Sequence, residues 1–184
     1  PISLMKIERR ILVTGASGYV GPRLVRQLLN EPEQDNSISV RIFVRDKAKV
    51  ASQPWISQVE VATGNANNFA ETCLALRGVH TAFYLLHSIG VGKHFDDIEA
   101  AMAENFAKAA AQEGVTQIVY LGGIANDKRH SKHLASRART GEILARGSVP
   151  VLELRAGIII GSGSASFEML RHLTHRLPVM TTPK

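Results

Sequence analysis

The sequence has 184 residues, of which 45% are hydrophobic and 21% charged, with one cysteine and a formal net charge of +6. This length suits one domain with a substantial core, and the apolar content excludes a disordered protein. One cysteine excludes an intramolecular disulfide, and no Cys/His spacing of a zinc finger is present. No apolar run approaches the roughly 20 residues of a membrane helix, and the first residues lack the apolar core of a signal peptide. We expect a cytoplasmic protein with no membrane partner.

Short apolar segments typical of buried strands alternate with segments of helical periodicity. The predicted strands are residues 10–14, 38–44, 58–62, 81–86, 117–121 and 151–155. The predicted helices are residues 19–30, 67–76, 93–113, 131–146 and 165–176. Because parallel strands need crossover connections, this alternation predicts a parallel sheet with helices on both faces. We expect an α/β, doubly wound Rossmann fold with the strand order 3-2-1-4-5-6.

The first predicted strand leads directly into a glycine-rich loop and then into a helix. Gly15 permits the tight turn, Gly18 lets the backbone approach a pyrophosphate, and Gly21 lets the helix pack against the strand. Free N–H groups at the start of the helix would bind the phosphates. The residues that we expect to contact a dinucleotide here are Gly15, Ser17, Gly18, Tyr19, Val20 and Gly21. The alternative is a tight turn with close helix packing and no ligand.

The end of the second predicted strand discriminates between the two nicotinamide dinucleotides. An acid there would bind the adenosine ribose and repel a 2′-phosphate, but this strand ends at Arg45, which can bind that phosphate. Asp46 keeps NAD open, because a shift of one residue would bring its carboxylate to the ribose. We expect NADP(H) as the cofactor, with NAD as the alternative, and Asn65 beside the adenine.

Three features carry a resemblance to a known family: the Thr-Gly-x-x-Gly-x-x-Gly loop at residues 14–21, Asn105, and the segment 149–163. They are similar to the short-chain dehydrogenase/reductase superfamily, in its extended and atypical branches, which include nucleoside-diphosphate-sugar-epimerase-like and nitrogen-regulator-like proteins. The resemblance implies that the segment 149–163 is the sixth strand and the loop beside the nicotinamide, with Ala156 and Gly157 at the cofactor.

The expected domain spans residues 5–184 and binds NAD(P), and residues 1–4 are expected to be a cloning remnant before Met5. The C-terminal substrate region that follows in longer family members is expected to be absent or truncated. The resemblance also implies a homodimer formed through the predicted helices 93–113 and 131–146.

The sequence departs from the family at all three catalytic positions. Family enzymes place Ser or Thr after the fifth strand, where this chain has Gly122 and Gly123. The Tyr and Lys that exchange the substrate proton and hold the nicotinamide ribose in the family correspond to Leu134 and Ala138. Whether the protein is an enzyme therefore stays open at this point.

Two residues are the remaining catalytic candidates. His87 follows the fourth predicted strand, after Leu86, at the sheet edge where ligands bind. It would either line the nicotinamide pocket together with Leu86 or transfer protons near neutral pH. Asn105 would either order a catalytic water or bind the backbone of the fourth strand. Arg139, on the helix that carries the family tyrosine, would either bind an anionic group or lie in solvent.

Two functions remain. The first is an NADP(H)-binding, atypical oxidoreductase or epimerase/dehydratase that acts on a small molecule without the usual Ser-Tyr-Lys set. The alternative is a non-catalytic dinucleotide-binding redox sensor that acts through a protein partner. Nucleic-acid binding rests only on charge, chiefly on the acid-free basic run at residues 128–139, which has no aromatic side chain for stacking on bases.

Overall fold

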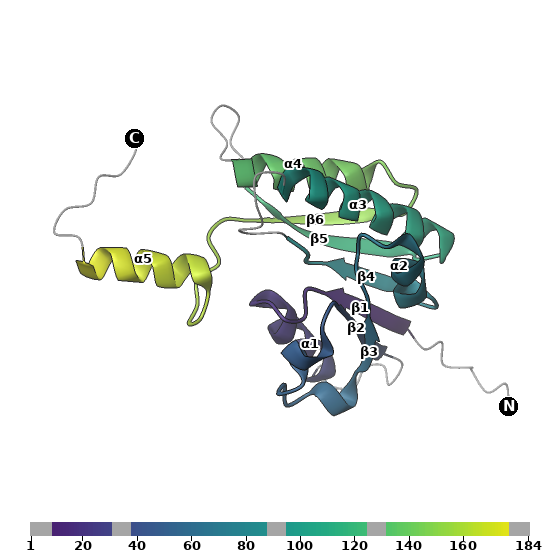
Figure 1. Ribbon diagram of the computed structural model, residues 1–184, viewed down its shortest axis with the longest axis horizontal. Coiled ribbons are helices and arrows are strands. Elements are labelled where there is room, and N and C mark those ends of the chain that lie inside the picture. Colours follow the sequence, from purple (N-terminus) through teal and green to yellow (C-terminus); the bar gives the residue numbers. More distant parts are fainter. Residues whose placement is uncertain (1–8, 31–37, 88–94, 125–131, 177–184) are drawn as a thin grey trace, which may run out of the picture.

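The computed structural model describes residues 9–30, 38–87, 95–124 and 132–176. Strands and helices alternate along the chain, with the carboxyl ends of the strands on the left in Figure 1. The elements are β1 (Arg9–Thr14), α1 (Val20–Asn30), β2 (Ile38–Val44), β3 (Glu60–Thr63), α2 (Phe69–Leu76), β4 (Thr81–Tyr84), α3 (Phe95–Gln112), β5 (Gln117–Gly123), α4 (Lys132–Ala145), β6 (Val151–Ala156) and α5 (Ala165–Arg176). Two short 3₁₀ helices, η1 (Lys47–Val50) and η2 (Ile56–Gln58), join β2 to β3.

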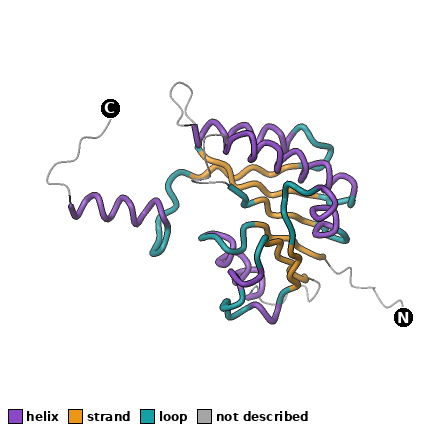
Figure 2. The backbone as a smooth tube through the Cα atoms, in the orientation of Figure 1, coloured by secondary structure: helices purple, strands orange, loops and turns teal. Residues whose placement is uncertain are grey.

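The six strands form one parallel sheet in the order β3-β2-β1-β4-β5-β6 (Figure 2). This confirms the predicted fold class and strand order. The bounds of β2 and α5 agree with the prediction, and the described ends of the other helices lie within two residues of it. Residues 1–8 lie outside the described residues. So do residues 93, 94 and 131, at the starts of two predicted helices, and residues 128–131, at the start of the basic run.

The strands β4 and β5 differ from the prediction at their carboxyl ends, where the site is expected. β4 ends at Tyr84 rather than residue 86, because β1 turns away after Thr14 and its backbone no longer pairs with β4. The amide of Leu85 donates instead to Oγ1 of Thr14, at 2.9 Å. β5 continues through Gly123, so Gly122 and Gly123 form the end of the strand and pair with Arg155 and Ala156 of β6.

Helices cover both faces of the sheet, and side chains alternate between two cores. Leu12 of β1 packs into a cluster with residues of α2, α3 and α4, whereas the next residue, Val13, packs with α1, η1 and η2. This is the alternation expected of a strand buried on both faces. On β6, Leu152 and Leu154 are 48% and 49% exposed on the face opposite α4, and α5 extends away from the sheet (Figure 1). None of the described helices is long and apolar enough to cross a membrane.

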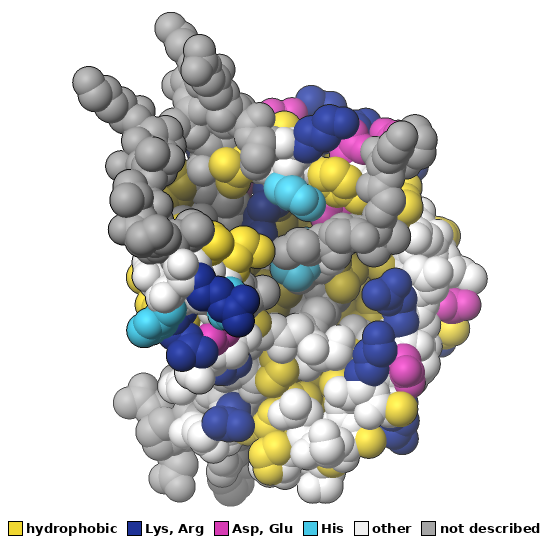
Figure 3. Space-filling view, turned by 60° about the vertical axis from the view of Figure 1, so that its left-hand side comes forward, with side chains coloured by type: hydrophobic (Ala, Val, Ile, Leu, Met, Phe, Trp, Pro, Cys, Tyr) yellow, Lys and Arg dark blue, Asp and Glu magenta, His cyan; other side chains and the backbone are white. Residues whose placement is uncertain are grey.

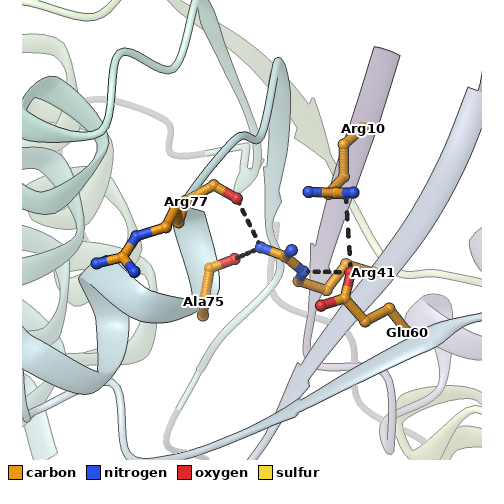
Figure 4. Close-up of polar contacts among 5 residues, drawn as sticks. All are labelled: Arg10, Arg41, Glu60, Ala75 and Arg77. Atoms are coloured by element: carbon orange, nitrogen blue, oxygen red, sulfur yellow. Dashed lines mark hydrogen bonds and ion pairs between the residues drawn. The ribbon is translucent and has the colours of Figure 1, made fainter. Parts of the chain in front are cut away.

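A buried arginine joins the strands β2 and β3 to α2. The side chain of Arg41, on β2, is 8% exposed, and its Nε lies 2.9 Å from the Glu60 carboxylate on β3. Its Nη1 donates to the carbonyl oxygens of Ala75 and Arg77, at 2.7 and 2.9 Å, at the C-terminal end of α2 (Figure 4). These carbonyls have no partner within the helix, and a cation is favourable at this end of the helix dipole. Arg41 thus satisfies the end of α2 and fixes it against β2 and β3.

The substitution Arg41→Met is expected to lower the free energy of unfolding by about 2 kcal/mol or more, because it leaves the Ala75 and Arg77 carbonyls without this donor in a buried place. Urea unfolding followed by circular dichroism measures the change. The matched control is Arg77→Met, because Arg77 is 69% exposed and its guanidinium lies 3.9 Å from Glu113. Equal stability of the two variants would contradict the role of Arg41.

Candidate dinucleotide site

The candidate site lies at the carboxyl ends of β1 and β4, where the strand order reverses. α1 leaves β1 on one face of the sheet, and α2, α3 and α4 cover the other, so the connections diverge and leave a crevice between them. Thr14, the last residue of β1, is fully buried, and its hydroxyl donates to the Phe83 carbonyl of β4 at 3.0 Å. Figure 3 looks onto this side of the molecule and shows a hollow with hydrophobic, histidine and basic side chains around it.

The glycine loop turns tightly between β1 and α1. Gly15 has a φ of +67°, and a Cβ there would lie 2.9 Å from the carbonyl oxygen of Leu85. A Cβ on Gly21 would overlap the carbonyl oxygen of Gly15 and lie 2.7 Å from the Cα of Ala16. Gly21 therefore packs the first turn of α1 directly against the loop backbone. These two glycines are required by the fold itself.

Gly18 differs from the other two glycines because the protein leaves space beside it. A Cβ on Gly18 would contact only the carbonyl oxygen of Gly15, at 3.3 Å, and both Gly18 and Ser17 are exposed. The Gly18 amide donates to that same carbonyl at 3.0 Å, which closes the turn. The exposed backbone at the start of α1 can receive a pyrophosphate, so the loop fits a dinucleotide.

The loop after β6 contacts the glycine loop through an aromatic–cation pair. Arg23 lies over the ring of Tyr19, 3.7 Å from its centroid, and its Nη1 donates to the Tyr19 carbonyl at 2.8 Å. Its Nη2 donates to the carbonyl of Ser162 at 3.2 Å. A Cβ on Gly161 would overlap the Tyr19 hydroxyl. Tyr19 therefore lies between α1 and the loop after β6, beside Val20, which begins the helix.

The two charged residues after β2, Arg45 and Asp46, lie in different environments. Arg45 is exposed. The carboxylate of Asp46 accepts a hydrogen bond from the Ala48 amide at 2.9 Å and caps the N-terminus of η1. The Asp46 carboxylate therefore has a hydrogen-bond partner within the chain, at the N-terminus of η1.

A polar network shapes the loop between β3 and α2, where Asn65 is predicted to contact adenine. The Asn65 amide donates to Glu71 Oε2 at 2.6 Å, and its side-chain oxygen accepts from the Asn67 amide at 3.1 Å. Nδ2 of Asn105, on α3, donates to the carbonyl of Asn67 at 2.6 Å. The alternative that Asn105 binds the backbone of the fourth strand is therefore wrong: its amide holds the loop after β3. Its catalytic role stays a prediction.

The ends of β4 and β6 lie at the same edge of the sheet. Leu86 is half-buried against the core on the side of α2, α3 and α4, and His87 is exposed. Ala156 ends β6, and its carbonyl accepts from the Ile124 amide at 3.1 Å. Gly157 is exposed, and a Cβ there would lie 3.9 Å from Cδ1 of Ile124. The predicted nicotinamide-side residues thus lie at the ends of β4 and β6, the two strands that flank β5.

The two glycines that end β5, where the sequence predicts that a catalytic hydroxyl is missing, lie against side chains of α4 and β6. A Cβ on Gly123 would lie 3.0 Å from Leu134 and 3.5 Å from Cδ and Nε of Arg137, both on α4. A Cβ on Gly122 would overlap the carboxylate of Glu153, which also lies close to Gly141 of α4. Larger side chains from α4 and β6 therefore fill the space beside the two glycines that end β5.

Two titratable side chains, those of Tyr120 and Cys73, are buried in the core. Burial raises the pKa of Tyr120 to about 12, an effect that the neighbouring Arg137 cation opposes, and the Tyr120 hydroxyl donates to the Arg137 carbonyl at 2.8 Å. Burial also raises the pKa of the Cys73 thiol. Arg139 lies on the surface, 3.6 Å from Asp97 of α3. The described residues include no cluster of His, Cys, Asp or Glu side chains that could hold a metal ion.

Sequence reasoning missed two side chains that shape the site, Arg23 and Glu71, and it noted Arg137 on the helix of the family tyrosine without giving it a partner. Glu71 follows Asn68 by three residues at the start of α2: the Glu71 amide donates to Oδ1 of Asn68, which caps the helix, and the Glu71 carboxylate accepts from Nδ2 of Asn68. That spacing could have identified Glu71. Arg23 and Arg137 contact segments far away in the sequence, so local patterns carry no signal for them.

The fold, the open glycine loop and the position of the crevice together define a protein that binds a dinucleotide. The chain belongs to the NAD(P)H-binding family, whose model matches residues 15–147. It is also 32% identical over 113 residues to sterol demethylase protein B of Methylococcus capsulatus. That match covers 59% of this chain and 33% of the relative, so the chain spans about a third of the relative's length.

Solved structures support the same fold. The triphenylmethane reductase of a Citrobacter species, complexed with NADP(H), is 24% identical with a TM-score of 0.68, covering 90% of this chain and 55% of that one. An NADPH-dependent quinone oxidoreductase of Escherichia coli, complexed with NADPH, is 25% identical with a TM-score of 0.63, covering 79% of this chain and 48% of that one. The protein is thus an NAD(P)H-binding protein whose fold is similar to that of these reductases, of which it spans about half the length.

The substitution Gly21→Ala is expected to lower the free energy of unfolding by about 2 kcal/mol or more, because the new Cβ overlaps backbone atoms that cannot move aside without opening the turn. The matched variant Gly18→Ala is expected to lower it by about 1 kcal/mol or less, because its Cβ would meet a single atom, the Gly15 carbonyl oxygen at 3.3 Å. Urea unfolding of the ligand-free protein compares them. A large loss in Gly18→Ala would show that the fold also requires this glycine.

Proposed function

We propose that the protein is an NADP(H)-binding oxidoreductase or epimerase-like enzyme that works without the Ser-Tyr-Lys set of its superfamily. The observation that carries the cofactor choice is the division of roles after β2: Arg45 is exposed, whereas the Asp46 carboxylate caps η1. An exposed guanidinium at this position can bind a 2′-phosphate through charge-assisted hydrogen bonds. A bound nicotinamide dinucleotide would supply hydride transfer.

The chain's own residues would bind the dinucleotide at three places. The Ser17 amide and the free amides at the start of α1 would donate to the pyrophosphate at the positive end of the α1 dipole, beside Gly18. Asn65 would contact the adenine from a loop that Asn105 and Glu71 hold in place. Leu86, His87, Ala156 and Gly157 would surround the nicotinamide end, with the exposed His87 imidazole as the candidate proton-transfer group.

The second candidate function is a non-catalytic redox sensor that binds the dinucleotide and acts through a protein partner. The observation that favours it is the apolar contact between Leu134 and Gly123, in the place of the catalytic tyrosine and serine. An absorbance change of NADPH that depends on an added substrate would support the enzyme, and retained binding with no turnover of any carbonyl substrate would support the sensor. The cytoplasmic location and the homodimer stay predictions.

The substitution Arg45→Ala is expected to weaken NADPH binding tenfold or more, about 1.4 kcal/mol, and to change NADH binding less than twofold, because only NADPH carries the 2′-phosphate. Calorimetric titration with each dinucleotide measures both values. Lys49→Ala is the control for loss of one nearby exposed charge, and Asp46→Ser, which keeps a capping oxygen, tests the acid. Equal loss of NADPH and NADH affinity in Arg45→Ala would rule out the 2′-phosphate role.

The substitution Gly18→Val is expected to abolish binding of both dinucleotides while the protein stays folded. The valine side chain would extend from Gly18 into the open space that the pyrophosphate needs, and the protein itself has little contact there. Calorimetry gives the affinity, and circular dichroism verifies the fold. Unchanged affinity in a folded variant would place the phosphates elsewhere.

A further inference from the structure

Arg137 is fixed over the carboxyl end of β5 by two hydrogen bonds. Its Nη2 donates to the carbonyl of Leu121 at 2.6 Å, and its own carbonyl accepts from the Tyr120 hydroxyl at 2.8 Å. The stem of the side chain lies against Gly123, where a Cβ would be 3.5 Å from Cδ and Nε. The guanidinium is therefore held in one place before any ligand arrives, so binding there would sacrifice little side-chain entropy.

The charge of Arg137 has no carboxylate partner among the described residues. Glu153, on the neighbouring strand, pairs instead with Arg155, at 3.0 Å. Glu99, which faces α4 from α3, accepts a hydrogen bond from the Ser136 hydroxyl. Nε of Arg137 is buried with no hydrogen-bond partner, and no described residue accepts from Nη1. A half-buried cation in this state is more stable when an anion joins it.

The position of this cation is the carboxyl edge of the sheet, next to the ends of β4 and β6. Gly123, against which Arg137 lies, pairs with Ala156, and Ala156 and Gly157 are predicted to contact the nicotinamide. A group bound by Arg137 would therefore lie on the α4 side of the reacting ring. Leu134, beside it, would cover the apolar part of the same molecule.

We propose that Arg137 binds a carboxylate or another small oxyanion group of the substrate and so orients that substrate beside the nicotinamide. The substrate class is thus anionic, and the guanidinium holds it where the superfamily uses a tyrosine hydroxyl. The planar guanidinium offers paired N–H donors that match the two oxygens of such a group. This inference rests on the proposed function, because it takes the nicotinamide to lie at this edge.

Anion titration of the NADP⁺-loaded protein tests the proposal, with sodium malonate and inorganic phosphate as probes followed by calorimetry. In Arg137→Met the affinity for the anion is expected to fall tenfold or more, and in Arg137→Lys the loss is expected to be smaller. Arg139→Met is the matched control, since Arg139 is on the same helix but exposed and near Asp97. It is expected to keep the affinity within twofold.

Three outcomes would overturn the assignment: no binding of malonate or phosphate to the unmodified protein, equal affinity in Arg137→Met, or an equal loss in Arg139→Met. A tenfold loss of NADP⁺ affinity in Arg137→Met would instead assign the arginine to the cofactor. Should Arg137→Met unfold, Arg137→Gln, which removes the charge but keeps a polar donor at the position of Nε, takes its place. NADP⁺ is titrated into the protein first, without any anion probe. No binding of NADP⁺ refutes the proposed function, and anion titration of the cofactor-free protein then decides the role of Arg137.

Discussion

The hydroxyl of Thr14 is the contact on which the crevice depends. β1 and β4 lie side by side, yet their chains leave in different directions, so the backbone ladder between them must end in a buried place. Phe83 and Leu85 would then hold a carbonyl and an amide without partners, each costing about 1–3 kcal/mol. A hydroxyl both donates and accepts, and that of Thr14 satisfies both groups. The strands can therefore separate at this point without leaving buried polar groups unpaired.

The surroundings of the crevice are fixed by contacts between segments far apart in the sequence. Arg23 connects α1 to the loop after β6, and Asn105 connects α3 to the loop after β3. At the opposite edge of the sheet, Arg41 connects β2 to the C-terminal end of α2. Each is a side chain that donates to a backbone carbonyl, so each fixes the path of a loop or a helix end rather than a single side chain. The described loops after β3 and β6 thus have a defined form before a ligand binds, which lowers the entropy lost on binding.

The fold could be predicted from the sequence because the alternation of strands and helices is a local pattern, and the crossover rules then leave few strand orders. The limits of that reasoning are visible in particular residues. Arg41 lies in a strand, at a position where a charged residue suggests exposure to solvent. It is buried because its side chain donates to carbonyls 34 and 36 residues away. The glycines that end β5 suggested an empty catalytic position, but Arg137 and Leu134 lie against it. Only three-dimensional packing brings these groups together.

The three glycines of the loop would not be conserved equally during evolution. A lineage that stopped using the dinucleotide would still be under selection to keep Gly15 and Gly21, because the turn and the helix cannot be built with a side chain at either place. A side chain at Gly18 would meet only the Gly15 carbonyl oxygen, so this position would be freer to change. Among distant descendants of such a protein, two-thirds of the motif would persist as a record of the fold. The middle glycine alone would record whether the ancestral ligand is still in use.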